Sequence, residues 1–176
     1  MAGAIRIRCL TTLGDREIHE LSEVLIDCVE GGASVSFMLP MTRAKADTFW
    51  RSTAASAVRG ERLVFVAEEA DGAIVGTAQI ILAQPENQPH RADVAKMLVH
   101  RRGRRRGIGA ALLVAAERHA LRSGKTVLVL DTASAEAERL YVRQGWQLCG
   151  RIPDYAFMPD GEPCATTIYY KSLRGP

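Results

Sequence analysis

The chain has 176 residues, of which 47% are hydrophobic and 24% are charged, and its formal net charge is +3. These values are ordinary for a globular protein, and the length predicts one domain over residues 1–176. They exclude a low-complexity chain, and no apolar run approaches the ~20 residues that are needed to cross a bilayer. We therefore expect no membrane partner.

The N-terminus and the cysteines indicate the compartment. The first residues, Met-Ala-Gly-Ala-Ile-Arg-Ile-Arg, lack the apolar core of a signal peptide. The cysteines are scattered without the close pairing of zinc or redox motifs, and the histidines are too dispersed to indicate a metal site. We therefore expect a cytoplasmic protein without a metal.

Two helices are predicted in the first third of the chain. The first is capped by Thr12 or Asp15 and continues at helical spacing until the glycines at 31–32 end it. The second follows Thr42, and Gly60 would end it in the left-handed conformation that glycine tolerates best. Its predicted buried stripe consists of Phe49, Trp50, Thr53, Ala54, Ala57 and Val58.

After the second helix, the sequence pattern becomes typical of β-strands. The runs 63–67 and 73–83 flank the turn signal Asp71-Gly72 and predict a hairpin. Residues 84–91 contain two prolines and indicate a loop, after which 92–99 returns to a strand.

The rest of the chain alternates helices and strands. Helices are predicted at 107–123 and 134–144, and strands at 126–131, 146–150 and 165–171. Strand–helix–strand units imply parallel neighbours, whereas the preceding hairpin implies antiparallel ones. The sequence therefore predicts an α/β protein with a mixed sheet flanked by helices.

One loop has the composition of an anion-binding site. Residues 104–109 read Arg-Arg-Arg-Gly-Ile-Gly and lie between an apolar strand and a predicted helix. The first N–H groups of a helix have no partner inside it and lie at the positive end of its dipole. Glycines let the backbone approach a ligand closely, so we expect a phosphate here.

A nucleic-acid-binding module is the alternative for this loop, because five arginines fall between residues 101 and 106. The low net charge and the absence of interleaved aromatic residues argue against that alternative. We therefore expect no nucleic acid partner.

Three blocks resemble the GNAT family of N-acetyltransferases, which use acetyl-coenzyme A (acetyl-CoA). Arg104-x-x-Gly107-x-Gly109 resembles the pyrophosphate loop of the family, and Met97-Leu98-Val99 resembles the strand that pairs with the pantetheine arm. Ala137-x-x-Leu140-Tyr141-x-x-x-Gly145-Trp146 is similar to the helix that carries the catalytic tyrosine. The resemblance implies a mostly antiparallel sheet with one parallel pair at the coenzyme site. The coenzyme-binding residues that it implies are Met97, Leu98, Val99, Arg104, Arg105, Arg106, Gly107, Ile108, Gly109 and Ser134.

Further segments are similar to the tabtoxin-resistance acetyltransferases of that family. They are residues 31–35, 130–132, 159–161 and 168–171. Two positions depart from the general family pattern: Arg105 stands where many members have glycine, and Ser134 where many have asparagine.

Acetyl transfer to an amine requires a proton acceptor and a proton donor. Freeing an amine of pKa near 10.4 at pH 7 costs about 4.6 kcal/mol, so a base is needed. Asp93 and Asp131, on adjoining parallel strands, are the candidate bases and would attract a cationic substrate; strand-end residues bonded to backbone are the alternative. Tyr141 is matched in pKa to protonate the leaving thiolate, although such a tyrosine is also typical of a core. His90 is a weaker candidate for moving protons.

The acceptor site is expected beside the loop 34–37 and the segment 153–163, with Ser34, Phe37, Asp93 and Asp131 binding the substrate. The predicted function is direct acetyl transfer from acetyl-CoA, within a ternary complex, to the primary amine of a small molecule. A tabtoxin-like β-lactam or a related amino compound would link this activity to antibiotic or toxin resistance. A protein N-terminus, a polyamine and an aminoglycoside remain open as acceptors, and the resemblance is consistent with a homodimer formed through late strands.

Overall fold

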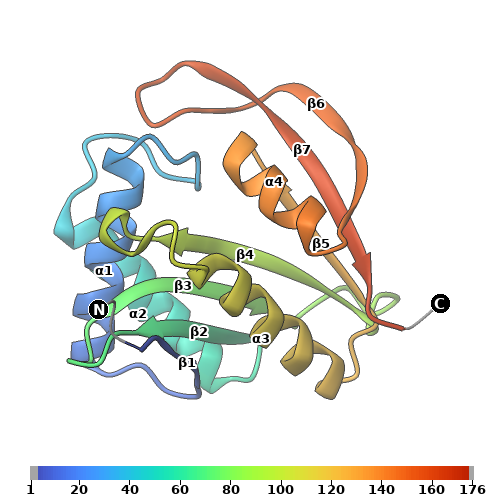
Figure 1. Cartoon of the computed structure of the whole chain (residues 1–176), viewed down its shortest axis with the longest axis horizontal. Helices are drawn as coiled ribbons and strands as arrows, with labels where there is room; N and C mark the ends of the chain where they lie inside the picture. Colours follow the sequence, from blue (N-terminus) through green and yellow to red (C-terminus); the bar gives the residue numbers. More distant parts are fainter. Residues whose placement is uncertain (1–3, 175–176) are drawn as a thin grey trace.

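The structure is a computed structural model that describes residues 4–174, so the outermost residues of the predicted domain 1–176 lie outside the described part. Its strands form one sheet in the order β1-β2-β3-β4-β5-β7-β6, flanked by helices (Figure 1). The strands are β1 (Arg6–Leu10), β2 (Arg62–Glu68), β3 (Ile74–Ile81), β4 (Arg91–Val99), β5 (Val127–Thr132), β6 (Gln147–Phe157) and β7 (Pro163–Ser172). The helices are α1 (Asp15–Glu30), α2 (Arg43–Val58), the short 3-10 helix η1 (Arg101–Gly103), α3 (Ile108–Arg122) and α4 (Ala135–Arg143).

The predicted mixed sheet is confirmed. Strands β1 to β4 pair antiparallel with their neighbours, β4 and β5 pair in parallel, and β7 runs antiparallel to both β5 and β6. The single parallel pair that the resemblance implies is also confirmed, since the second strand–helix–strand unit does not add another. There β7 inserts between β5 and β6, so only the first crossover produces a hydrogen-bonded parallel pair.

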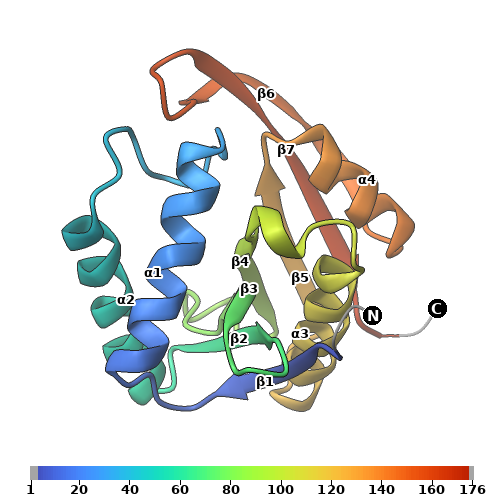
Figure 2. The ribbon, with the colours of Figure 1, turned by 60° about the vertical axis from the view of Figure 1, so that its left-hand side comes forward.

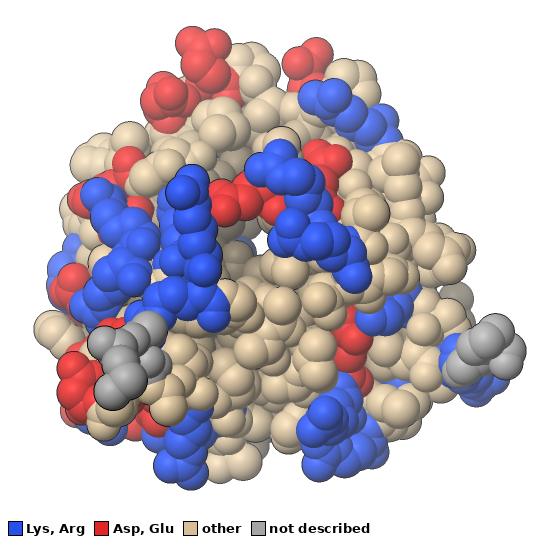
Figure 3. Space-filling model, viewed as in Figure 1, with Lys and Arg blue, Asp and Glu red and all other residues tan. Residues whose placement is uncertain are grey.

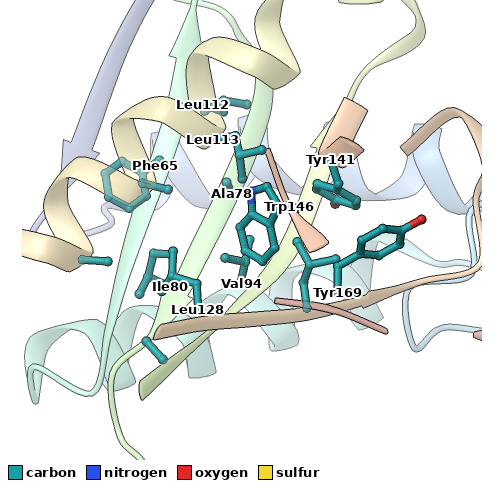
Figure 4. Close-up of a cluster of buried hydrophobic side chains, with 14 of the residues drawn as sticks. Phe65, Ala78, Ile80, Val94, Leu112, Leu113, Leu128, Tyr141, Trp146 and Tyr169 are labelled. Atoms are coloured by element: carbon teal, nitrogen blue, oxygen red, sulfur yellow. The ribbon is translucent and has the colours of Figure 1, made fainter. Parts of the chain in front are cut away.

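Helices cover both faces of the sheet (Figure 2). The alternation within β2 separates two cores: Val64 and Val66 pack with residues of α1 and α2, whereas Phe65 and Ala67 pack with residues of α3. The core on the α3 side extends to Tyr141 of α4 and to Tyr169 of β7 (Figure 4). Within residues 4–174, no helix is both long enough and apolar enough to cross a membrane.

The start of α1 differs from the prediction. Its N-cap is Gly14 rather than Thr12 or Asp15, and the carboxylate of Glu17 accepts a hydrogen bond from the Gly14 N–H at 3.1 Å. Asp15 is instead the first helical residue, where its negative charge is favourable near the positive end of the helix dipole.

The boundaries of α2 match the prediction, but its buried face is rotated. The Thr42 side chain accepts from the Lys45 N–H at 3.3 Å, and Gly60 has the predicted left-handed φ of +73°. Val58, predicted to be buried, is 69% exposed. The fully buried positions follow the i, i+4, i+7, i+10 row; they are Ala46, Trp50, Thr53 and Ser56.

The edges of the sheet were the least predictable part. The first strand, β1, was not predicted, although Ile7 and Cys9 alternate along it and, with Ile5 just before it, pack against the core. Strand β6 continues well beyond the predicted 146–150, because its pairing with β7 persists although nearly all of its side chains are solvent-exposed. Burial therefore ceases to mark a strand at such an edge.

Candidate active site

The site is created where β4 and β5 separate. The parallel pairing covers only 91–93 of β4 and 127–129 of β5, and both strands then continue apart. In β4 the register skips so that Thr77 faces Leu98 while Gln79 faces Ala95, which leaves a bulge at Lys96 with a φ of +50°. A cavity of about 700 Å³ opens between the diverging strands.

The loop before α3 has the geometry of an anion site. Arg105 and Gly107 have φ values of +60° and +75°, and the first helical bond runs from the Ala111 N–H to the Gly107 carbonyl at 3.0 Å. The N–H groups of residues 108–110 therefore have no acceptor within the helix. A left-handed turn followed by free amides forms a concave donor surface that suits a diphosphate.

Arginines reach this cavity from two sides. Arg104 and Arg105 line it from the loop, and Arg139 and Arg143 line it from α4. Figure 3 shows Lys and Arg side chains on both sides of a hollow in this face of the molecule. The arginines on α4 were missed by the sequence analysis, although their i, i+4 spacing places them on one face of that helix.

The other predicted coenzyme contacts divide into three groups. Met97, Leu98, Val99, Gly107, Ile108 and Gly109 all line the cavity. Ser134 also lines it, but its hydroxyl accepts from the Ala137 N–H at 3.3 Å and caps α4. The side chain of Arg106 is directed elsewhere, because it donates to Glu69 at 2.5 Å, and Arg106 is absent from the described lining of the cavity.

Asp131 and Tyr141 are brought together at the cavity. Asp131 lies near the end of β5 and accepts a hydrogen bond from the Thr166 hydroxyl at 2.8 Å. Tyr141 is 4% exposed and packs between Trp146 and Tyr169, with ring centroids 5.8 and 6.0 Å away (Figure 4). Burial raises the pKa of the Tyr141 phenol, and the charge of Asp131 raises it further, so the phenol is held in its protonated form.

Asp93 is placed away from this centre, contrary to the sequence expectation of two carboxylates at one level. It pairs in register with Val129, two residues before Asp131, where the strands are still joined. Its carboxylate binds Arg91 and accepts from Gln84 Nε2 at 3.0 Å. Neither Asp93 nor His90 is among the described residues that line the cavity between β4 and β5.

A second cavity, of about 350 Å³, adjoins the first. Ser34, Asp131 and Ala133 line both cavities, so the two spaces meet beside these residues, of which Asp131 is the charged one. Phe37, which the sequence analysis expects beside the acceptor, lines only the second one. From the predicted segment 153–163, the second cavity takes Tyr155, Ala156 and Phe157.

Lys96 is a further charged residue that the sequence analysis missed. It lines the first cavity from the β4 bulge, and its ammonium donates to the Ser36 hydroxyl at 3.3 Å. The same nitrogen lies 5.9 and 5.5 Å from the ring centroids of Phe37 and Phe49. Burial lowers the pKa of Lys96, an effect that the charge of Asp131 opposes. A lone lysine in an apolar strand carries no sequence pattern that would have identified it.

Nothing in the donor set favours a metal: within residues 4–174, no group of three or more His, Cys, Asp or Glu side chains is arranged to hold one. The residues present do fit a nucleotide thioester. The start of α3 and the arginines that line the cavity suit its phosphates, and Asp131 and Tyr141 line the same cavity.

Comparison with known proteins agrees with this geometry. A model of the acetyltransferase (GNAT) family matches residues 33–146. The chain is 29% identical, over 134 residues, to an uncharacterized N-acetyltransferase in the hisH-hisA intergenic region of Azospirillum brasilense; the match covers 75% of this chain and 77% of that protein.

Solved structures share the fold at low sequence identity. The structure of yncA from Salmonella typhimurium, with its cofactor acetyl-CoA, is 19% identical with a TM-score of 0.79, covering 98% of this chain and 96% of that one. The ribosomal-protein-alanine N-acetyltransferase of Brucella melitensis is 22% identical with a TM-score of 0.78, covering 95% and 99%. The family model extends from the end of α1 through the anion loop to Trp146. The chain therefore belongs to the acetyltransferase (GNAT) family.

Proposed function

We propose that this protein transfers the acetyl group of acetyl-CoA to the primary amine of a small molecule. The observation that carries the proposal is the continuous cavity that joins the anion-binding start of α3 to Asp131 and Tyr141. The related fold of yncA, solved with acetyl-CoA, supports the choice of this coenzyme.

The coenzyme is proposed to bind along the first cavity. Its diphosphate accepts hydrogen bonds from the amides at the start of α3, while Arg104 and Arg139 supply positive charge from opposite sides. The backbone of residues 97–99, next to the bulge, is the proposed partner of the pantetheine amides. Gly109 keeps α3 close to α4, because a Cβ there would lie 3.0 Å from the Leu140 Cδ2 atom.

Acetyl-CoA supplies the acetyl group as a thioester, and side chains of the protein accept and donate the protons. Asp131 is proposed to hold the incoming ammonium and to take its proton, directly or through water. Tyr141, kept protonated by its surroundings, is proposed to donate a proton to the departing sulfur.

Direct transfer is proposed rather than a covalent enzyme intermediate. Burial, with a smaller contribution from Asp27, raises the pKa of the Cys28 thiol in the first cavity to about 11, so this thiol is a poor nucleophile.

A small amino compound is the proposed acceptor, and a tabtoxin-like β-lactam is one member of that group. The limited volume of the second cavity, about 350 Å³, favours it over an aminoglycoside. A protein N-terminus remains the alternative, since one structural neighbour is described as a ribosomal-protein-alanine N-acetyltransferase.

Two further proposals concern location and assembly. The four cysteines are free thiols, which is compatible with the proposed cytoplasmic location. Strand β6 is an edge strand and exposes Leu148 and Ile152, which supports the proposed homodimer through late strands. Light scattering coupled to gel filtration tests the proposed homodimer, and a monomer at high protein concentration would contradict it.

The experiment that tests the function is a thiol-release assay with acetyl-CoA and a panel of amine classes. We expect thiol release that depends on both the amine and the protein and that is absent when acetyl-CoA is left out. Double-stranded DNA is the control for the arginine loop, because binding that acetyl-CoA fails to displace would favour a nucleic-acid module instead. No release with any amine, together with no acetyl-CoA binding, would contradict the proposal.

A further inference from the structure

Resting on the proposed function, we infer that the acceptor is a primary amine attached to an apolar, aromatic-sized body that carries no carboxylate. The inference concerns the second cavity, which meets the coenzyme cavity at Asp131. It excludes free amino acids, dipeptides and polyamines as preferred acceptors, and so narrows the small amino compounds proposed above to those without a carboxylate.

The charge of the second cavity is the first argument. Among the described residues that line it, Asp131 is the sole Asp, Glu, Lys or Arg. An ammonium entering this space therefore finds one carboxylate, at the junction where the acetyl group would be presented. A carboxylate on the same molecule would find no cation among the described residues that line the second cavity, and an unpaired ion in a confined site is strongly disfavoured. A second ammonium would likewise lack a partner.

The walls of the cavity are the second argument. Phe37 and Met38 come from the loop after α1, and Tyr155 and Phe157 come from β6. Tyr155 and Phe157 are 56% and 58% exposed, so a ligand between these walls would remove aromatic surface from water. Apolar walls with one placed charge are typical of sites for small amphipathic ligands.

The nearest candidate to bind a carboxylate is Lys96, and its contacts argue against that role. Its ammonium lies against the rings of Phe37 and Phe49 and donates to the Ser36 hydroxyl. It lines the coenzyme cavity rather than the second one. Binding a substrate carboxylate would require it to leave these partners.

The test compares amines that share one ring. 2-Phenylethylamine, phenylalanine amide and phenylalanine differ in a substituent that is absent, neutral or anionic, and putrescine adds a polycation without a ring. We expect kcat/KM, measured by thiol release, to be at least about tenfold higher for phenylethylamine and the amide than for phenylalanine or putrescine. Equal or higher kcat/KM for phenylalanine or putrescine would overturn the inference.

Variants test whether the second cavity is the source of this preference among amines. Phe157→Ser is expected to lower kcat/KM for phenylethylamine about fivefold without raising the KM for acetyl-CoA. Tyr155→Arg supplies the missing cation and is expected to raise the phenylalanine-to-phenylethylamine ratio of kcat/KM at least about tenfold. Val58→Ser is the matched control, since Val58 is an exposed apolar residue that is absent from the described lining of both cavities.

Failure of the inference is distinguishable from failure of the proposed function. If acetyl-CoA does not bind and no amine releases thiol, the proposed function fails. If thiol is released but phenylalanine is preferred, and Lys96→Gln abolishes that preference, Lys96 binds the carboxylate and the inference alone is wrong. If the turnover of phenylethylamine per enzyme molecule falls as the enzyme concentration rises, a second copy of the chain covers the cavity. That result would also overturn the inference.

Discussion

The proposed site has two halves, one for the coenzyme and one for the acceptor, and they differ in construction. The coenzyme half consists largely of backbone: free amides at the start of α3, a left-handed turn at Arg105 and the bulged edge of β4. The acceptor half consists of side chains contributed by the loop after α1, the end of β5 and the β6–β7 hairpin. The first half follows from one short segment, whereas the second exists only after distant segments have come together.

This difference predicts where substitutions act. Backbone donors are present whatever side chain they carry, so single changes in the coenzyme half should weaken binding by modest factors. Asp131 and Tyr141 at the junction are individual groups without a substitute, so changes there should have the largest effects on turnover.

Tyr141→Phe is expected to have the largest effect. It removes the proposed proton donor while leaving the ring between Trp146 and Tyr169, so kcat should fall about 100-fold or more with little change in the KM for acetyl-CoA. Steady-state kinetics with both substrates measures this. Tyr169→Phe is the control, because its hydroxyl donates to Glu138 and Tyr169 is absent from the described cavity lining. Unchanged kcat in Tyr141→Phe would remove the acid role.

Asp131→Asn is expected to come next. The amide retains an acceptor for the Thr166 hydroxyl but loses the charge that holds the ammonium, so kcat/KM for the amine should fall about tenfold or more. Asp93→Asn separates the two carboxylates that the sequence could not distinguish, and its kcat/KM should remain within about threefold of wild type. A larger loss in Asp93→Asn than in Asp131→Asn would reverse the assignment.

Removal of the α4 arginines tests the coenzyme half. Arg139→Ala and Arg143→Ala should each raise the KM for acetyl-CoA about fivefold, with a dependence on salt and little change in kcat. Arg122→Ala, on the exposed end of α3, serves as the control. Equal KM values in all three variants would place the coenzyme elsewhere.

Substitutions in the left-handed turn should change the free energy of unfolding by smaller amounts, and in opposite directions at residues 105 and 107. A Cβ at Gly107 would meet nothing within 4 Å, so Gly107→Ala should lower the free energy of unfolding by about 1 kcal/mol through φ strain alone. Arg105→Gly relieves the same kind of strain, so it should raise the free energy of unfolding by about 0.5–1 kcal/mol. The same substitution should weaken acetyl-CoA binding. Urea unfolding measures both, and changes of the same sign would contradict this account.

The smallest expected effect is that of the Tyr141 pKa on the pH profile. Burial, and then the charge of Asp131, raises the pKa of Tyr141 above its ordinary value of 10.0. The donating, protonated phenol is therefore present below that raised pKa and is lost only as pH rises through it. Between about pH 7 and pH 9 we expect kcat/KM to rise as the amine loses its proton, without a falling limb from this group. A falling limb centred below pH 9 that disappears in Tyr141→Phe would contradict the raised pKa.

The coenzyme half was largely predictable because its signals are local. Gly107 and the arginines at 104–105 lie within one loop, and the periodicities of β4 and α3 place that loop between them. The sequence did not separate Arg106 from its neighbours, because its partner Glu69 belongs to the distant β2–β3 connection.

The acceptor half was predicted only in outline. Ser34 and Phe37 were identified, but the long β6–β7 pairing that presents Tyr155 and Phe157 was not. Asp93 and Asp131 looked equivalent because the sequence does not reveal the register of a parallel pair, which places Asp93 opposite Val129. A shift of two residues along one strand was enough to separate them.

A crystal structure of the protein with acetyl-CoA tests the central claim most directly. The account predicts the diphosphate within about 3 Å of the amides that begin α3, and the thioester between β4 and β5 within reach of the Tyr141 hydroxyl. A diphosphate bound elsewhere, or a thioester distant from both Tyr141 and Asp131, would contradict it.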